Sequence, residues 1–355
     1  MDSSLVMTRT RLLRAPGKLA IFLLFLVMGG CSSFHPIYTP TGDVLTAYSE
    51  DEATPYVMQM SDSALACSMG EGLDPLVYSF SRVTDAPDKT GALLMLLAAN
   101  CAEKRAWEAE LAYLRADYRG DVPAAKDARE KAKRLNALTA ERRYVVFQRA
   151  MRAYDYDPAD ESAECPFLYN DQDEITFLLG LLTGMQAIVN DANSGAQAGV
   201  PRDIAPQAER AAQCLDNEKW GGLPNAIRAM VWLLIPDTRP KLSPDPWEVF
   251  RNSSDLGVKT GIRASMALEA VAAETFGRED VLKDVIARFA KSDESFRVWK
   301  DYRLVDESAR NVIQFSSDKY WTAHYGYRTP QSRFGSLSDK TQVDSSQVMD
   351  LDDLL

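Results

Sequence analysis

The sequence has few of the residues on which common active sites depend. Its 355 residues include only two histidines, His35 and His324, so a metal site built from several histidines is excluded. Asp and Glu (51) outnumber Lys and Arg (40), and the formal net charge of −11 excludes nucleic-acid binding through a generally basic surface. The motifs G-x-S-x-G, H-E-x-x-H, G-x-x-x-x-G-K-[ST] and G-x-G-x-x-G after a strand are missing. We therefore expect a non-catalytic protein with no metal and no cofactor.

Long apolar runs are also scarce. Residues 19–28 (LAIFLLFLVM) form an unbroken apolar run of 10 residues after a basic start, which is half of the roughly 20 residues that a membrane-spanning helix needs. The most apolar later stretch, residues 175–189, has 15 residues and predicts a core helix rather than a membrane span. Within it Gly180 and Gly184 are four residues apart, and this spacing favours a notch where another helix packs closely.

The first run ends in a pattern typical of bacterial lipoproteins. Gly29 and Gly30 directly precede Cys31, as in the lipobox that a lipoprotein signal peptidase recognises. We predict that residues 1–30 are a signal peptide, that cleavage falls between Gly30 and Cys31, and that Cys31 carries the lipid anchor. A plain secretory signal with an incidental cysteine is the alternative. Ser32, where Asp would suggest inner-membrane retention, favours the periplasmic face of the outer membrane over the inner membrane.

Four cysteines remain after the lipid site, an even number for an oxidising compartment. They are Cys67, Cys101, Cys165 and Cys214. Of the three complete pairings we favour Cys67–Cys101 and Cys165–Cys214, because each pair flanks a short helical unit. Four buried free thiols are the alternative.

Composition divides the mature chain into three parts. Residues 31–57, with several Pro, Ser, Thr and Gly, predict a flexible tether between the membrane and the folded body. Residues 58–330 predict a helical body. Residues 331–355 are rich in Asp, Ser and Thr, and predict a disordered acidic tail.

Hydrophobic spacing and helix-stop residues indicate an all-α fold, because no region alternates strongly enough to demand a sheet. We expect an irregular array of antiparallel helical hairpins, resembling a tetratricopeptide solenoid. The expected helices are two short ones within 61–81, then 90–103, 106–118, 124–154, one that includes 175–189, 208–215, 225–235, 246–256, 260–276, 278–291 and 301–315.

Two residues stand out as candidates for chemistry. Trp220 lies in a Gly-Gly-Pro loop rather than on a helix, so it is a candidate ligand-binding residue, whereas most of the six tryptophans are expected to fill the core. His324 could form a catalytic triad with Asp318 and a nearby serine, but closeness in sequence is weak support for that interpretation.

Three sequence blocks together resemble a known family. They are Asp173-Glu174 with residues 177–187 (FLLGLLTGMQA), residues 199–204 (GVPRDI) with 211–216 (AAQCLD), and residues 317–321 (SDKYW) leading to 326–330 (GYRTP). With the lipobox and the helical body, the chain resembles the T-component (TatT-like) periplasmic lipoproteins of TRAP transporters over roughly residues 31–330.

The resemblance implies a non-catalytic, membrane-anchored scaffold built from tetratricopeptide-like hairpins. It implies assembly into a trimer, docking of a periplasmic solute-binding protein, and a small hydrophobic or organic-acid ligand that is held or passed on. It assigns no functional residue beyond Cys31. The alternative function is a structural scaffold lipoprotein in outer-envelope assembly.

Overall fold

The computed structural model describes residues 37–338, and within this range the chain is helical and contains no strand. The predicted signal peptide and the predicted lipid site, Cys31, lie outside the described residues. The α-helices are α2 (Tyr38–Tyr48), α3 (Thr54–Met58), α4 (Ser63–Tyr78), α5 (Asp88–Tyr118), α6 (Val122–Ala153), α7 (Asp171–Ser194), α8 (Ile204–Ala212), α9 (Leu223–Leu234), α10 (Pro246–Thr260), α11 (Ala264–Thr275), α12 (Glu279–Ser292) and α13 (Arg303–Tyr325). Single turns are η1 (Ser49–Ala53), η2 (Ser79–Arg82), η3 (Pro236–Thr238), η4 (Lys300–Tyr302) and η5 (Gln331–Arg333). The expected all-α array is confirmed.

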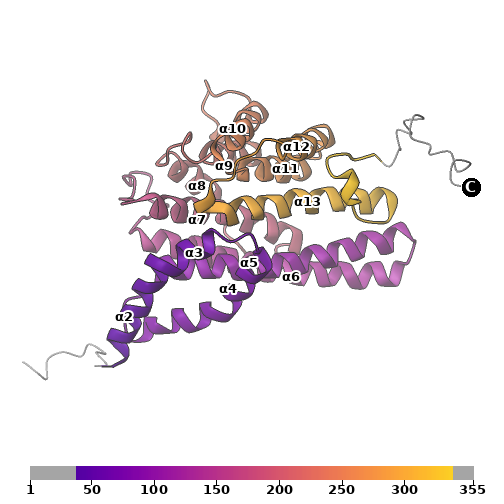
Figure 1. Ribbon diagram of the computed structural model, residues 1–355. Helices are drawn as coiled ribbons and strands as arrows, with labels where there is room; N and C mark the ends of the chain where they lie inside the picture. The colour runs from indigo at the N-terminus through magenta and orange to yellow at the C-terminus, as the bar shows by residue number, and fades with distance from the viewer. Residues whose placement is uncertain (1–36, 339–355) are drawn as a thin grey trace, which may run out of the picture.

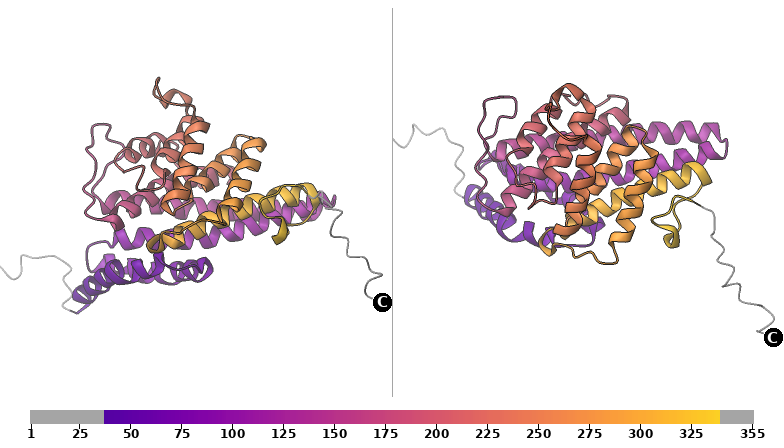
Figure 2. Two further views of the ribbon diagram at one scale, coloured as in Figure 1. Left: turned by 45° about the horizontal axis from the view of Figure 1, so that its top comes forward. Right: turned by 90° about the horizontal axis from the view of Figure 1, so that it is seen from above.

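The helices stack in chain order, and the last one returns to the middle. α4, α5, α6 and α7 pack side by side, α8 and α9 pack on α7, and α10, α11 and α12 continue the stack from α9 (Figure 1). α13 then packs against both α11 and α5, so the end of the chain closes the array instead of extending it. The distal parts of α5, α6 and α13 project beyond the short helices (Figure 2). Helix lengths range from 5 to 32 residues, so the hairpins do not repeat regularly.

Two predicted helix breaks are wrong. Residues 90–118 belong to one 31-residue helix, α5, and the chain between 103 and 106 contains no glycine or proline that would end it. α4 likewise continues through Gly70, Gly72 and Pro75. A Cβ on Gly70 would come within 2.5 Å of the Ala98 backbone nitrogen, so that glycine serves the close approach of α4 to α5.

The predicted flexible tether is wrong from residue 38 onward, because α2, η1 and α3 are helical. Pro55 is no obstacle, since it occupies the first turn of α3, where a backbone N–H has no partner within the helix. α2 is also fixed by tertiary contacts. The Thr39 hydroxyl donates to the Val83 carbonyl at 2.7 Å, and a Cβ on Gly42 would meet Thr84 at 2.5 Å.

The predicted tail begins later than residue 331. η5 and the residues after it pack on the body, where Phe334 makes an edge-to-face contact with Phe289 and the Trp321 indole N–H donates to the Ser336 carbonyl at 2.9 Å. The part of the tail prediction that concerns residues 339–355 lies outside the described residues.

The predicted disulfides are confirmed. Cys67–Cys101 joins α4 to α5, and Cys165–Cys214 joins the 154–170 loop to the turn after α8. Both bridges close chain segments of several tens of residues, and the entropy that they remove from the unfolded chain stabilises these connections.

The apolar stretch 175–189 lies in α7, which is a core helix as predicted. It is long and apolar enough to span a bilayer, but 72% of its most apolar window is buried by other helices. Its start is set by Asn170, which accepts a hydrogen bond from the Asp173 backbone N–H at 2.9 Å, and by acids in the first turn. A Cβ on Gly184 would come within 2.7 Å of Phe147, so the predicted packing notch is confirmed.

Candidate functional site

A largely apolar pocket lies where the returning helix α13 meets α4, α5, α7 and α11, with α3 at its edge. The cavity volume is about 110 Å³. A single water needs only on the order of 10–15 Å³ on the same measure of cavity volume. The pocket therefore holds a small organic molecule or several waters. The pocket exists only because α13 crosses back over α5.

Apolar side chains make up most of the wall. They come from every helix around the pocket, and the largest contribution is the leucine face of α5. The apolar lining residues are Val57, Met58, Ala66, Met69, Leu93, Leu94, Leu96, Leu97, Trp107, Leu179, Leu182, Ala264, Ala267, Leu268, Val271, Leu304, Val305, Ala309 and Val312. Such a wall favours a ligand with a hydrocarbon part.

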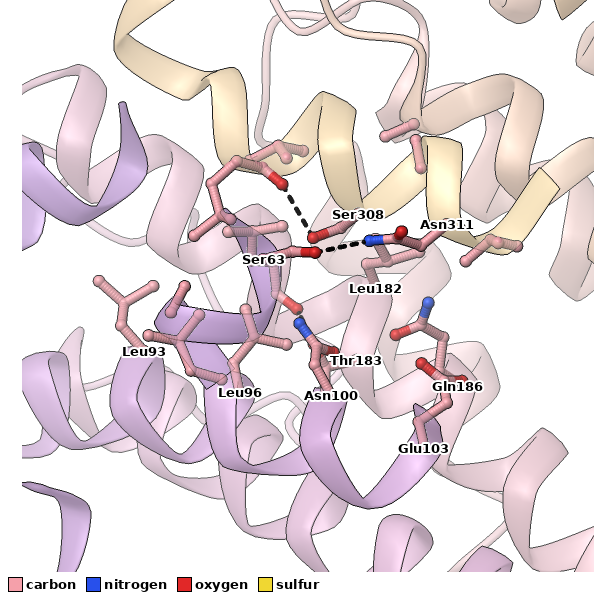
Figure 3. A pocket seen from close by; sticks show the side chains of 18 of the residues that line it. Ser63, Leu93, Leu96, Asn100, Glu103, Leu182, Thr183, Gln186, Ser308 and Asn311 are labelled. Carbon is pink, nitrogen blue, oxygen red and sulfur yellow. Dashed lines mark hydrogen bonds between the residues drawn. The ribbon is translucent and has the colours of Figure 1, made fainter. Parts of the chain in front are cut away.

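Polar side chains are grouped in part of the wall. Figure 3 shows Glu103 and Gln186 on the side of the pocket opposite Leu93, with Asn100 between Glu103 and Leu96. The Ser63 hydroxyl oxygen accepts hydrogen bonds from Lys104 Nζ at 2.9 Å and from Asn311 Nδ2 at 3.0 Å. These donors come from α5 and α13, so the hydroxyl at the start of α4 ties both helices together.

The two charged groups deepest in this wall neutralise each other. Arg143 Nη2 donates to Glu103 Oε2 at 2.6 Å, and Nη1 donates to the side-chain oxygen of Asn190. Asn190 in turn donates to Asn136 Oδ1 at 2.8 Å. Because the arginine is 3% exposed, these hydrogen bonds compensate the loss of water at its two terminal nitrogens, whereas Nε has no hydrogen-bond partner among the described residues.

Lys104 is a charged lining residue for which hydrogen bonds and ion pairs only partly compensate the loss of water on burial. Of the described residues, no carboxylate lies within 4.0 Å of its ammonium group, and its hydrogen bond goes to the neutral Ser63 hydroxyl. Partial burial lowers the pKa of Lys104, and the more distant charges of Asp62 and Glu103 only oppose that shift. The site therefore presents an under-compensated cation at the edge of an apolar pocket.

Trp220, the candidate ligand-binding residue from the sequence, belongs to the core in the structure. It is 1% exposed and lies outside the pocket wall. Its indole N–H donates to Glu174 Oε2 at 2.6 Å, and its ring stacks on Trp299 at a centroid distance of 5.5 Å. The Gly-Gly-Pro loop around it is buried against α10 rather than exposed, since a Cβ on Gly222 would meet the Ser253 backbone at 2.5 Å.

His324 and Asp318 do not form a pair. The His324 ring is exposed at the end of α13, where Nδ1 contacts the Tyr320 carbonyl at 2.8 Å and the ring stacks on the Tyr320 ring. Asp318 is buried, and its Oδ1 accepts hydrogen bonds from the Thr329 backbone and the Gln314 amide. Asp318 fixes the turn after α13 and does not orient the imidazole.

Sequence reasoning missed the residues of the polar wall. The leucines of α5 have a helical spacing that indicates a buried face, but that spacing does not distinguish a filled core from a pocket. Ser63 is 41 positions from Lys104 and 248 positions from Asn311, and no motif connects them.

Comparison with known proteins adds no relative: no protein-family model, no curated protein and no solved structure matches this chain. The site must therefore be interpreted from its own geometry.

Proposed function

We propose that this protein is a non-catalytic, lipid-anchored helical binding protein of the periplasm, which holds a small hydrophobic or organic-acid ligand and docks a periplasmic solute-binding protein. The observation that carries the ligand role is the apolar pocket that the return of α13 creates. A pocket with apolar walls and a few convergent polar groups is the usual form of a small-molecule site. The docking role and a trimeric assembly follow from the resemblance to T-component lipoproteins.

The position of α2 supports the anchor. α2 begins at Tyr38, seven residues after Cys31, so a lipid on Cys31 would hold this helix within roughly 25 Å of the bilayer. α2 lies at one end of the molecule (Figure 1) and exposes Val44, Leu45 and Tyr48, and Ile37 just before the helix is exposed as well. An apolar face so near the proposed lipid site suits an interfacial position.

The anchor gives the first testable prediction. Cells that express the full chain and grow with a palmitate analogue are expected to label it, and Cys31→Ser is expected to abolish the label and release the protein from membranes. One acyl chain binds a membrane only marginally and several bind it firmly, so the change in distribution should be nearly complete. Ser33→Ala, a substitution two residues after Cys31 that leaves the lipobox and both disulfides unchanged, is the matched control. Equal labelling of wild type and Cys31→Ser would contradict the anchor.

The partner gives a second prediction. Affinity purification of the tagged, lipidated protein from cross-linked membranes is expected to recover a periplasmic solute-binding protein, identified by mass spectrometry. A tagged lipoprotein of unrelated fold, expressed at the same level, controls for proteins that adhere to any anchored bait. Recovery of outer-envelope assembly proteins in its place would contradict the transport role and support the alternative function of an assembly scaffold.

A further inference from the structure

The polar wall of the pocket includes hydrogen-bond donors that are not fully used. Ser63 Oγ accepts from Lys104 and from Asn311, and neither bond uses the Ser63 O–H donor. An ammonium has three donors and an amide nitrogen has two, so further donors remain on both partners. Ser63 of α4, Lys104 of α5 and Asn311 of α13 thus hold unused hydrogen-bond donors close to the Ser63 hydroxyl.

The side chains around the Ser63 hydroxyl carry a positive charge, that of Lys104. Glu103, the carboxylate next to Lys104 in the chain, is committed to Arg143 at 2.6 Å. Asp62, the other acid near Lys104, accepts from the Ala64 and Leu65 backbone N–H groups at 3.0 and 2.9 Å, where it caps α4. Neither acid forms an ion pair with Lys104 within 4.0 Å, so a compact anion on Lys104 would supply the compensation that the two acids leave incomplete.

The wall away from the Ser63 hydroxyl is suited to hydrocarbon. Leu93, Leu96 and Leu97 of α5, Leu182 of α7 and Leu268 of α11 all line the pocket. Figure 3 shows Leu93 and Leu96 on the side away from Glu103 and Gln186. A second charged group on a ligand would lie among these leucines without a partner and would lose its hydration. This excludes dicarboxylates, and the positive charge of Lys104 disfavours amines.

We infer that the pocket binds an aliphatic monocarboxylate, whose carboxylate accepts hydrogen bonds from Lys104, Ser63 and Asn311 and whose chain lies along the leucines of α5. This inference rests on the proposed ligand-binding function and adds the chemical class of the ligand and the residues that recognise it. Partial burial lowers the pKa of Lys104 because it removes water from the ammonium group. The same loss of water favours carboxylate binding, because a bound anion restores the interactions that burial removes.

Calorimetric titration of the secreted, unlipidated Cys31→Ser chain tests this inference with four probes of equal chain length. They are octanoate, octanol, octylamine and octanedioate. Octanoate is expected to bind at least tenfold more tightly than the other three, because only octanoate offers both an acceptor anion and an uninterrupted hydrocarbon chain. A series from butanoate upward is expected to gain about fourfold in affinity per methylene until the pocket is full.

Lys104→Met keeps the length of the side chain and removes the charge. It is expected to weaken octanoate binding on the order of 10- to 100-fold, the effect of losing a charge-assisted hydrogen bond, and to leave octanol binding unchanged. Unchanged octanol binding also shows that the variant is folded. Lys133→Met, at a partly exposed lysine on α6 that pairs with Glu130, is the control with the same change of charge.

The outcomes separate the two claims. If octanol and octanoate bind equally and Lys104→Met affects neither, the carboxylate assignment is overturned and the proposed apolar pocket stands. If no probe binds, both the assignment and the ligand role are overturned. Hexadecanoate identifies the source: binding tighter than octanoate indicates a fatty acid taken from the membrane, and weaker binding indicates a shorter free acid.

Discussion

Replacing Arg263 by methionine is expected to lower the free energy of unfolding by about 3–5 kcal/mol, because it leaves a buried carboxylate without its partner. Arg263 is 1% exposed and lies just before α11. Its Nε and Nη2 donate to the two oxygens of Asp306 at 3.0 and 2.7 Å, and its Nη1 donates to Asp293 at 2.6 Å. Its guanidinium also lies 3.7 Å from the ring centroid of Phe296.

The loss should also reach the pocket. Asp306 lies in the first turn of α13, one or two residues from the lining residues Leu304 and Val305, so Arg263 fixes the end of α13 that forms the wall. We therefore expect weaker octanoate binding together with the lower stability. Urea unfolding followed by circular dichroism measures the first effect, and calorimetry measures the second.

Two variants make the Arg263 result specific. Arg278→Met breaks an exposed ion pair with Asp280 and is expected to change stability little, since exposed pairs are well solvated. The double variant Arg263→Met/Asp306→Leu removes both buried charges and is expected to recover part of the loss, because the unpaired carboxylate is then gone. A loss in Arg263→Met no greater than that in Arg278→Met would contradict the role of this ion pair.

Adding one methyl group at Gly180 is expected to destabilise the protein by about 1–3 kcal/mol, the usual effect of overpacking a core. An ideal Cβ on Gly180 would lie 2.4 Å from the Ala150 Cβ, where α7 crosses α6. That atom is attached directly to the backbone, so the clash is relieved only by moving one helix away from the other. Chemical denaturation of Gly180→Ala compares directly with wild type.

Gly72→Ala is the matched control for this change. Gly72 is also inside a helix, but no atom lies within 4 Å of its ideal Cβ. The same substitution there should stabilise the protein by about 0.4–1 kcal/mol, because alanine restricts the unfolded chain more than glycine does. Opposite signs at the two positions would show that close helix packing, not helix propensity, requires Gly180. Equal effects would contradict this explanation.

Local patterns in the sequence were sufficient for part of the fold. The all-α class, a long helix over most of 124–154 and the core position of 175–189 follow from spacing and composition, and the structure has them. The favoured pairing of the cysteines, one of three, is also the one observed. The same patterns gave wrong predictions where a helix break or a loop depends on contacts with residues far away in the sequence. Residues 38–58 resemble a tether in composition, yet contacts of α2 with Val83 and Thr84 make them part of the body.

The candidate site shows more clearly the difference between what local sequence patterns predict and what contacts between distant residues decide. Trp220 was chosen because it lies in a Gly-Gly-Pro loop, but Glu174, 46 residues away, accepts its indole N–H inside the core. The polar wall was missed because Ser63, Lys104 and Asn311 are unremarkable in their own segments and meet only when α13 returns across α5.

The sequence by itself determined the periodicity of the helices, because that depends on neighbouring residues. It favoured the cysteine pairing that the structure has, and the lipid site at Cys31 stays a prediction. Only the tertiary structure decided that the helices enclose a pocket and that a partly buried lysine lies at its edge. Both depend on the direction in which the last helix crosses the earlier ones. That direction is set by close packing and by the buried Arg263–Asp306 pair, whose partners are 43 residues apart.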